Sequence, residues 1–209
     1  MDINYKTIDK GATAEYEIRK SRFLTFIEPI ADEAAGIAFI NKIKKQYFDA
    51  RHNCSAYIIG HSTLQKADDD GEPSGTAGKP ILEVIKKNEL CDLVIVVTRY
   101  FGGIKLGAGG LIRAYGKAAT LGLENCNIVI RTLFIRIRID IDYTLLSILE
   151  NNFQKKAIFI EDKIFTDQVQ LFILVKKEET DTLIQEITNW TAAACKITTL
   201  NETYKNMPN

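Results

Sequence analysis

The stretch TLFIRIRID, residues 132–140, places a large aliphatic side chain at every second position. Successive side chains of a β-strand point to opposite faces, so Leu133, Ile135, Ile137 and Ile139 share one face. The other face carries Phe134, Arg136, Arg138 and Asp140. This alternation predicts a strand in an antiparallel sheet of which one face is covered.

The residues after this strand switch repeatedly between helical and strand patterns. We expect helices over 142–156 and 178–190, and strands over 157–161, 168–177 and 196–200. The resulting order, β-α-β-β-α-β, is the ferredoxin-like arrangement. We therefore expect an α+β protein of two domains, residues 1–128 and 129–209, of which the second is ferredoxin-like.

The preceding part of the chain also mixes strands and helices. Expected strands cover 22–30, 54–60 and 93–100, and expected helices cover 31–48, 79–89 and 111–124. Asp32 is placed to cap the first of these helices. Residues 93–100 have the continuous apolar character of a strand buried on both faces. Between the expected strand 54–60 and the expected helix 79–89, the polar residues 63–78 are expected to form a loop.

The composition is that of a globular protein. Hydrophobic residues make up 46% and charged residues 26% of the 209 residues, which argues against wholesale disorder. The 27 Lys and Arg residues balance 27 Asp and Glu residues. Such a balance argues against histone-like binding of nucleic acid but leaves room for a local basic patch.

Three features favour a cytoplasmic protein with no membrane partner. The N-terminus lacks the apolar core of a secretory signal. No apolar run approaches the roughly 20 residues that a membrane helix needs. The four cysteines, Cys54, Cys91, Cys126 and Cys195, are widely spaced without a CxxC pair. A disulfide framework or thiolate zinc site is therefore not expected, and a reducing compartment is.

The segment RYFGGIKLGAGGLIRAYGKAA, residues 99–119, contains six glycines and four cations. It is not a Walker A loop, because Ala118 stands where Ser or Thr must follow Gly-Lys. It is not a Rossmann loop either, because Ile112 stands at the third glycine position. The segment therefore matches neither standard nucleotide-binding motif.

The segment 99–119 is still a candidate anion-binding site. The glycines Gly102, Gly103, Gly107 and Gly109 permit positive φ and close approach, and the helix that follows presents its positive end. The cations are Arg99, Lys105, Arg113 and Lys117, and no acid occurs from residue 93 to 123. Arg113 and Lys117 share a helix face and repel each other, which a facing anion would relieve. Gly116 within this helix suggests close approach of a neighbour. The alternative is a geometric strand-to-helix turn with a solvated charged face.

Four carboxylates crowd into residues 68–72, at Asp68, Asp69, Asp70 and Glu72. Ca²⁺ and Mg²⁺ favour such oxygen ligands, but the EF-hand spacing is missing because Lys79 occupies its twelfth position. We expect a shaped, solvated turn rather than a metal site. The only histidines, His52 and His61, stand in no HExxH or nucleophile pattern. We therefore assign no catalytic residue and no cofactor.

At these same residues the sequence resembles the IMPACT family, called YigZ in bacteria. The run of residues 78–107 fits its signature of glycines, spaced aliphatic residues, an arginine and two aromatics. The matching positions are Gly78, Ile81, Leu82, Ile85, Leu90, Val96, Val97, Arg99, Tyr100, Phe101, Gly102, Gly103, Leu106 and Gly107. The preceding DGEPSGTAGKP is equally typical and contributes Asp70, Gly71, Glu72, Pro73, Gly75, Thr76 and Gly78.

The resemblance implies a fold for each half. The first domain would be similar to the second domain of small-subunit ribosomal protein five and to domain IV of translocation factor G. The second would resemble domain V of the same factor. Eukaryotic members of the family regulate translation by competing for the activator of a starvation-responsive initiation-factor kinase. They carry an additional RWD domain that this sequence lacks, so the resemblance implies a bacterial two-domain type.

The leading hypothesis is a non-enzymatic cytosolic protein linked to translation that binds RNA, the ribosome or a translation factor. Sequence-specific binding of DNA is not expected. The alternative is an enzyme or binding protein for a phosphorylated small molecule, with Asp70 and Glu72 holding Mg²⁺ opposite the glycine loop. A third hypothesis is a protein-interaction module.

Overall fold

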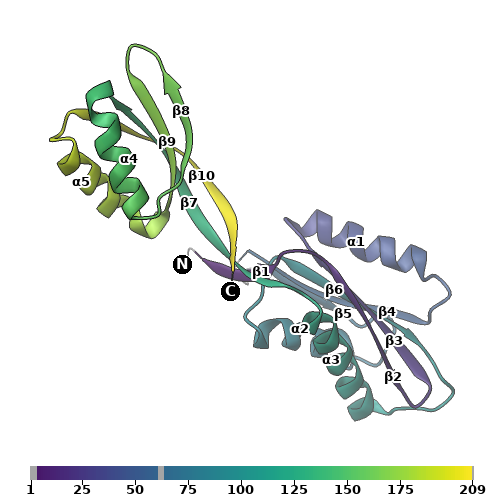
Figure 1. The fold of residues 1–209 in the computed structure, drawn as a ribbon. Coiled ribbons are helices and arrows are strands. Elements are labelled where there is room, and N and C mark those ends of the chain that lie inside the picture. The colour runs from purple at the N-terminus through teal and green to yellow at the C-terminus, as the bar shows by residue number, and fades with distance from the viewer. Residues whose placement is uncertain (1–3, 61–63, 209) are drawn as a thin grey trace. The chain divides into compact units, whose positions relative to one another are not determined.

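The computed structural model describes residues 4–60 and 64–208, so His61 lies outside the described residues. The chain divides into two compact units, formed mainly by residues 4–130 and 131–206. Each unit contains helices packed against an antiparallel sheet (Figure 1). The predicted α+β class is confirmed.

The first unit is built on a sheet with the strand order β2-β3-β6-β4-β5. The strands of this sheet are β2 (Ala12–Ile18), β3 (Ser21–Pro29), β4 (His52–Ile59), β5 (Leu64–Asp68) and β6 (Leu93–Tyr100). Strand β1 (Tyr5–Ile8) precedes them and is not part of this sheet. Its helices are α1 (Glu33–Gln46), α2 (Gly78–Lys87) and α3 (Ala108–Glu124). The central strand β6 pairs antiparallel with both β3 and β4.

Strand β6 is buried on both faces, as its continuous apolar run predicts. Ile95 and Val97 belong to a core that also contains residues of α2 and α3. Val94 and Val96 belong to a separate core with Ile43 of α1. The sheet therefore carries α2 and α3 on one face and α1 on the other (Figure 1).

The residues just before α1 and α3 explain where these two helices begin. Asp32 caps α1 as predicted, and its carboxylate accepts a hydrogen bond from the Ala35 N–H at 2.8 Å. Helix α3 begins three residues earlier than predicted, at Ala108. Gly107 precedes it with a φ of +70°, a left-handed conformation that favours glycine. Glycine has no side chain that could cap a helix, so the sequence shows no N-cap residue at this helix start.

The expectation of a loop over the whole of residues 63–78 is wrong. Residues 64–68 of the predicted loop form strand β5, which pairs antiparallel with β4. All five residues of β5, which is an edge strand of this sheet, are exposed. A strand with no buried face shows no alternation between apolar and polar residues, so the pattern gave no signal.

The second unit has the predicted β-α-β-β-α-β order. Its elements are β7 (Ile128–Ile141), α4 (Leu146–Lys155), β8 (Ile160–Phe165), β9 (Val169–Lys176), α5 (Thr180–Trp190) and β10 (Cys195–Pro208), with short 3-10 turns Tyr143–Leu145 and Lys177–Glu179. The strands lie in the order β8-β9-β7, and β10 also pairs with β7. This order is that of the ferredoxin-like arrangement, and both helices cover the same face (Figure 1).

The alternation in TLFIRIRID sets the buried face of this unit. Ile135, Ile137 and Ile139 are buried in the core, together with the alternating residues of β9. The register places Ile137 opposite Ile173, so the apolar faces of the two central strands coincide. The pattern from which the strand was predicted is therefore the pattern that fills the core.

Gly116 of α3 does not mark the close approach that its position suggests. A Cβ built at this residue would have no neighbour within 4 Å. We expect Gly116→Ala to stabilise the protein by up to about 1 kcal/mol, because alanine costs less backbone entropy in a helix. Urea unfolding measures this change, and destabilisation by the variant would contradict the open environment.

Gly122 on the same helix provides the matched control. A Cβ there would lie 2.6 Å from Thr25 Cγ2 and 2.9 Å from Ile27 Cδ1. Gly122→Ala is expected to destabilise the protein, although the helix propensity changes by the same amount.

Candidate functional site

The loop between β5 and α2 is held together by its own carboxylates. Asp69 accepts hydrogen bonds from the N–H groups of Gly75, Ala77 and Gly78 at 2.7, 3.0 and 2.8 Å. It thereby satisfies the first N–H groups of α2, which has no side-chain cap at Ala77. Burial of Asp69 acts to raise its pKa, but these three hydrogen bonds outweigh burial and lower it.

Asp70 also forms hydrogen bonds with other residues of the first unit, through its carboxylate and its carbonyl oxygen. Its carboxylate accepts from the Asn53 N–H at 2.6 Å and from Lys44 Nζ at 2.6 Å. Its carbonyl oxygen lies 2.8 Å from Nδ1 of His52, which must be the donor of that hydrogen bond. Within residues 4–60 and 64–208, no group of three His, Cys, Asp or Glu side chains is arranged to hold a metal ion.

Glu72 is the centre of a buried polar cluster. Its side chain is 4% exposed, and Oε1 accepts hydrogen bonds from Arg99 Nη1 at 2.7 Å and from the Tyr115 hydroxyl at 2.8 Å. Nε2 of His52 lies 3.9 Å from the other carboxylate oxygen. The Cys54 thiol donates to the Tyr115 hydroxyl at 3.3 Å. Burial raises the pKa of both Cys54 and Tyr115, so both groups keep their protons.

Arg99 makes cation–π contacts with two aromatic rings. Its guanidinium carbon is 5.6 Å from the ring centre of Phe23 and 5.6 Å from that of Phe101. The side chain is 8% exposed. Nη1 binds Glu72, whereas Nε is buried and has no hydrogen-bond partner among the described residues. The Arg99–Glu72 pair joins β6 to the loop that carries the acidic residues.

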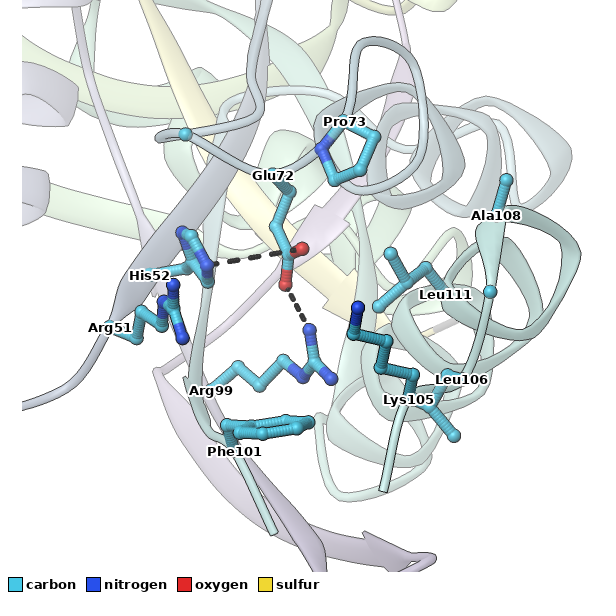
Figure 2. Close-up of a pocket in the computed structure, with 12 residues that line it drawn as sticks. Arg51, His52, Glu72, Pro73, Arg99, Phe101, Lys105, Leu106, Ala108 and Leu111 are labelled. Atoms are coloured by element: carbon cyan, nitrogen blue, oxygen red, sulfur yellow. Dashed lines mark hydrogen bonds and ion pairs between the residues drawn. The ribbon is translucent and has the colours of Figure 1, made fainter. Parts of the chain in front are cut away.

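A pocket of about 410 Å³ opens beside this cluster (Figure 2). Three cationic side chains, of Arg51, Arg99 and Lys105, line it together with the single carboxylate of Glu72. The other lining residues are His52, Gly71, Pro73, Phe101, Leu106, Gly107, Ala108 and Leu111. The first turn of α3 therefore forms one wall and the 68–78 loop forms another.

The predicted glycines have different roles. A Cβ at Gly102 would lie 2.0 Å from the backbone carbon and oxygen of Lys20, so glycine is needed there for packing. Gly103 and Gly107 have φ of +85° and +70°, with open space around both. A Cβ at Gly109 would meet only Nη1 of Arg113, at 3.7 Å. Packing thus accounts for Gly102, whereas the other three border open space.

The predicted cations also fall into two groups. Arg99 is buried and bound to Glu72, so it is part of the pocket wall rather than a free surface charge. Lys105, Arg113 and Lys117 are exposed, and their side chains make no ion pair or hydrogen bond within the described part of the chain. We call these three residues the α3 basic surface. No acidic residue lies in the first turn of α3.

Sequence reasoning missed Arg51. This residue is exposed, lines the pocket and has no ion pair with any described residue. It precedes β4 in a connection that matches no motif, and only the fold brings it opposite Lys105 (Figure 2). Its partners in the pocket are 48 and 54 residues away in sequence, at Arg99 and Lys105.

These features define a two-unit α+β protein with a basic pocket bordered by glycines. The chain belongs to the IMPACT family. Residues 19–123 match the Impact N-terminal domain, and residues 139–194 match a domain of unknown function, DUF1949. None of the helices within residues 4–60 and 64–208 is both long and apolar enough to cross a membrane.

Relatives of this chain occur in bacteria and eukaryotes. It is 45% identical over 189 residues to IMPACT family member YvyE of Bacillus subtilis, covering 90% of this chain and 87% of that protein. It is 34% identical to IMPACT family member YigZ of Escherichia coli, covering 78% and 80%. Protein IMPACT of Xenopus laevis is 34% identical but matches only 43% of this chain and 30% of its own length. A crystal structure of a hypothetical protein superposes with a TM-score of 0.64 at 26% identity, covering 96% of this chain and 99% of that one.

Proposed function

We propose that this protein binds RNA through the α3 basic surface and acts in translation as a non-enzymatic cytoplasmic protein. The observation that carries the proposal is the set of three exposed cations on α3 and in the loop before it, whose side chains have no partner among the described residues. RNA phosphates are the anions that such a surface is suited to contact, whether the RNA is free or part of the ribosome.

The electrostatics of α3 support anion binding. The first N–H groups of a helix have no partner within it, and they carry the positive end of the dipole. In α3 they are preceded by Gly107, which has no side chain to cap them. Arg113 lies over this first turn, next to Gly109. Because no acid occurs between residues 93 and 123, no carboxylate of this segment competes for the cations.

Membership of the IMPACT family gives the proposed link to translation. The relatives of this chain include proteins named IMPACT in Xenopus and an IMPACT homolog in yeast. The resemblance of both domains to parts of a translocation factor points in the same direction, although one fold serves many functions. The proposed surface supplies a specific contact that experiments can test.

We expect Arg113→Ala/Lys117→Ala to weaken binding to single-stranded RNA and to reduce its salt dependence. Each phosphate contact on a single strand adds about 0.7 to the slope of log affinity against log salt concentration. Loss of two contacts is therefore expected to flatten the slope by roughly 1 to 2 units. Fluorescence anisotropy at several salt concentrations measures it.

Lys42 and Lys45 of α1 provide a matched control. Both are exposed, and α1 covers the opposite face of the sheet from α3. Lys42→Ala/Lys45→Ala removes the same charge and is expected to leave the slope unchanged. If both double variants flatten the slope equally, binding depends on net charge alone and the proposed surface is wrong.

The structure does not favour the magnesium-dependent alternative. The carboxylate of Asp70 is bound by the Asn53 N–H and Lys44, and Oε1 of Glu72 is bound by Arg99 and Tyr115. In the expected arrangement Asp70 and Glu72 hold Mg²⁺ opposite the glycine loop, which would require Asp70 to give up its bond to Lys44 or to the Asn53 N–H.

A further inference from the structure

We propose that the pocket between the 68–78 loop and the start of α3 binds a phosphomonoester, and that this group is the terminal monophosphate of an RNA strand. The inference rests on the proposed function, because the α3 basic surface would hold the adjoining strand. The pocket and that surface share Lys105, and Arg113 of the surface lies next to Gly109 in the turn of α3 that lines the pocket, so one strand can contact both.

The size of the pocket suits a nucleotide. Sites for small ligands usually measure about 300 to 1,000 Å³. At about 410 Å³, this pocket is larger than a bare phosphate requires and far too small for a duplex. A strand end can enter such a pocket, whereas the middle of a strand would have to loop into it.

The charge of the pocket distinguishes a strand end from an internal phosphate. Three cations, Arg51, Arg99 and Lys105, face one carboxylate, of Glu72, which leaves two positive charges uncompensated. A phosphomonoester carries a charge of about −1.5 to −2 at pH 7, but an internal phosphodiester carries only one negative charge. The uncompensated charge therefore matches the terminal group.

Arg99 provides an independent indication of a ligand. Its side chain is more than nine-tenths buried, yet only Nη1 has a hydrogen-bond partner among the residues described. The guanidinium faces the space bounded by Lys105, Leu106 and Leu111 (Figure 2). Because Arg99 lines the pocket, the N–H groups of its guanidinium that Glu72 does not bind are suited to donate to phosphate oxygens placed there. Its contacts with the rings of Phe23 and Phe101 restrict the guanidinium before any ligand arrives.

The rim of the pocket can accommodate the rest of a nucleotide. Phe101 is 42% exposed and offers an aromatic surface for a base to stack on. Leu106 and Leu111 add apolar surface on the opposite wall. Gly107 has open space around it, so a phosphate can approach the backbone at the start of α3.

The test compares one RNA sequence in three forms: with a 5′-monophosphate, with a 3′-monophosphate and with hydroxyls at both ends. Anisotropy of an internal fluorophore gives the affinities of the full-length protein at fixed salt. We expect one phosphorylated form to bind roughly tenfold or more tightly than the hydroxyl form. Arg51→Ala should bring this ratio close to one, whereas Lys42→Ala should preserve it. Arg51 and Lys42 are exposed, and circular dichroism checks that both variants fold.

Calorimetry with adenosine monophosphate separates a strand end from a free nucleotide. Equal binding of all three RNA forms overturns the inference and leaves the proposed function standing. If no RNA binds but adenosine monophosphate binds in an Arg51-dependent manner, the proposed function fails and the phosphomonoester comes from a free nucleotide. If neither RNA nor adenosine monophosphate binds, both proposals are overturned.

Discussion

Replacing Glu72 with alanine is expected to destabilise the first unit by about 3 to 5 kcal/mol, because the change leaves the buried charge of Arg99 without its partner. Glu72 also accepts the hydrogen bond of the Tyr115 hydroxyl, so a second buried donor loses its acceptor. Urea unfolding followed by circular dichroism measures the loss. Trp190, the only tryptophan, lies in the second unit, and its fluorescence transition should not move.

An exposed ion pair of the same unit serves as the control. Arg22 and Glu15 are 2.7 Å apart, but both side chains are about half exposed. Glu15→Ala is expected to change the free energy of unfolding far less than Glu72→Ala does, because water screens an exposed ion pair. A loss for Glu72→Ala as small as that for Glu15→Ala would show that the Glu72–Arg99 pair does not hold the loop to β6.

Gly102→Ala is expected to destabilise the first unit by about 3 kcal/mol or more, which is a larger loss than most single substitutions cause. The new Cβ would lie 2.0 Å from backbone atoms of Lys20, which cannot rotate away as a side chain does. Strands β3 and β6 are paired from Arg22 and Tyr100 onward, so the two segments cannot easily separate. Urea unfolding again measures the effect.

The neighbouring glycine separates steric conflict from backbone strain. Gly103 has a φ of +85°, but its added Cβ would have no neighbour within 4 Å. Gly103→Ala is expected to cost only about 1 to 2 kcal/mol, the penalty of a left-handed conformation. Similar losses for both variants would contradict the close contact between Gly102 and Lys20.

Local patterns predicted the elements whose side chains alternate or repeat. The aliphatic spacing of 132–140, the apolar run of β6 and the cap at Asp32 each corresponded to the observed structure. Strand β5 was missed because neither of its faces is buried. The strands β1 and β2 were also not anticipated, since their residues alternate between intermediate and exposed positions or form too short a run.

The candidate site was harder to predict because its contacts are long-range. The sequence identified Glu72 and Arg99 as parts of one family signature. It did not reveal that these two residues, 27 positions apart in the chain, form a buried ion pair. The acidic run 68–72 suggested a solvated turn, whereas Asp69 and Asp70 bind backbone N–H groups within the protein. Arg51 carried no signal at all. The α3 basic surface was predicted residue by residue, but its role stays a proposal.

Co-sedimentation with ribosomes tests the central proposal most directly. The protein is predicted to sediment with ribosomes at about 50 mM salt and to be largely released at about 200 mM, because phosphate contacts exchange with counterions. Arg113→Glu/Lys117→Glu should abolish sedimentation at the lower concentration, while Lys42→Glu/Lys45→Glu should not. Absence of the wild-type protein from the ribosomal pellet at about 50 mM salt, or equal sedimentation of the two charge-reversed variants, would contradict RNA binding through the α3 basic surface.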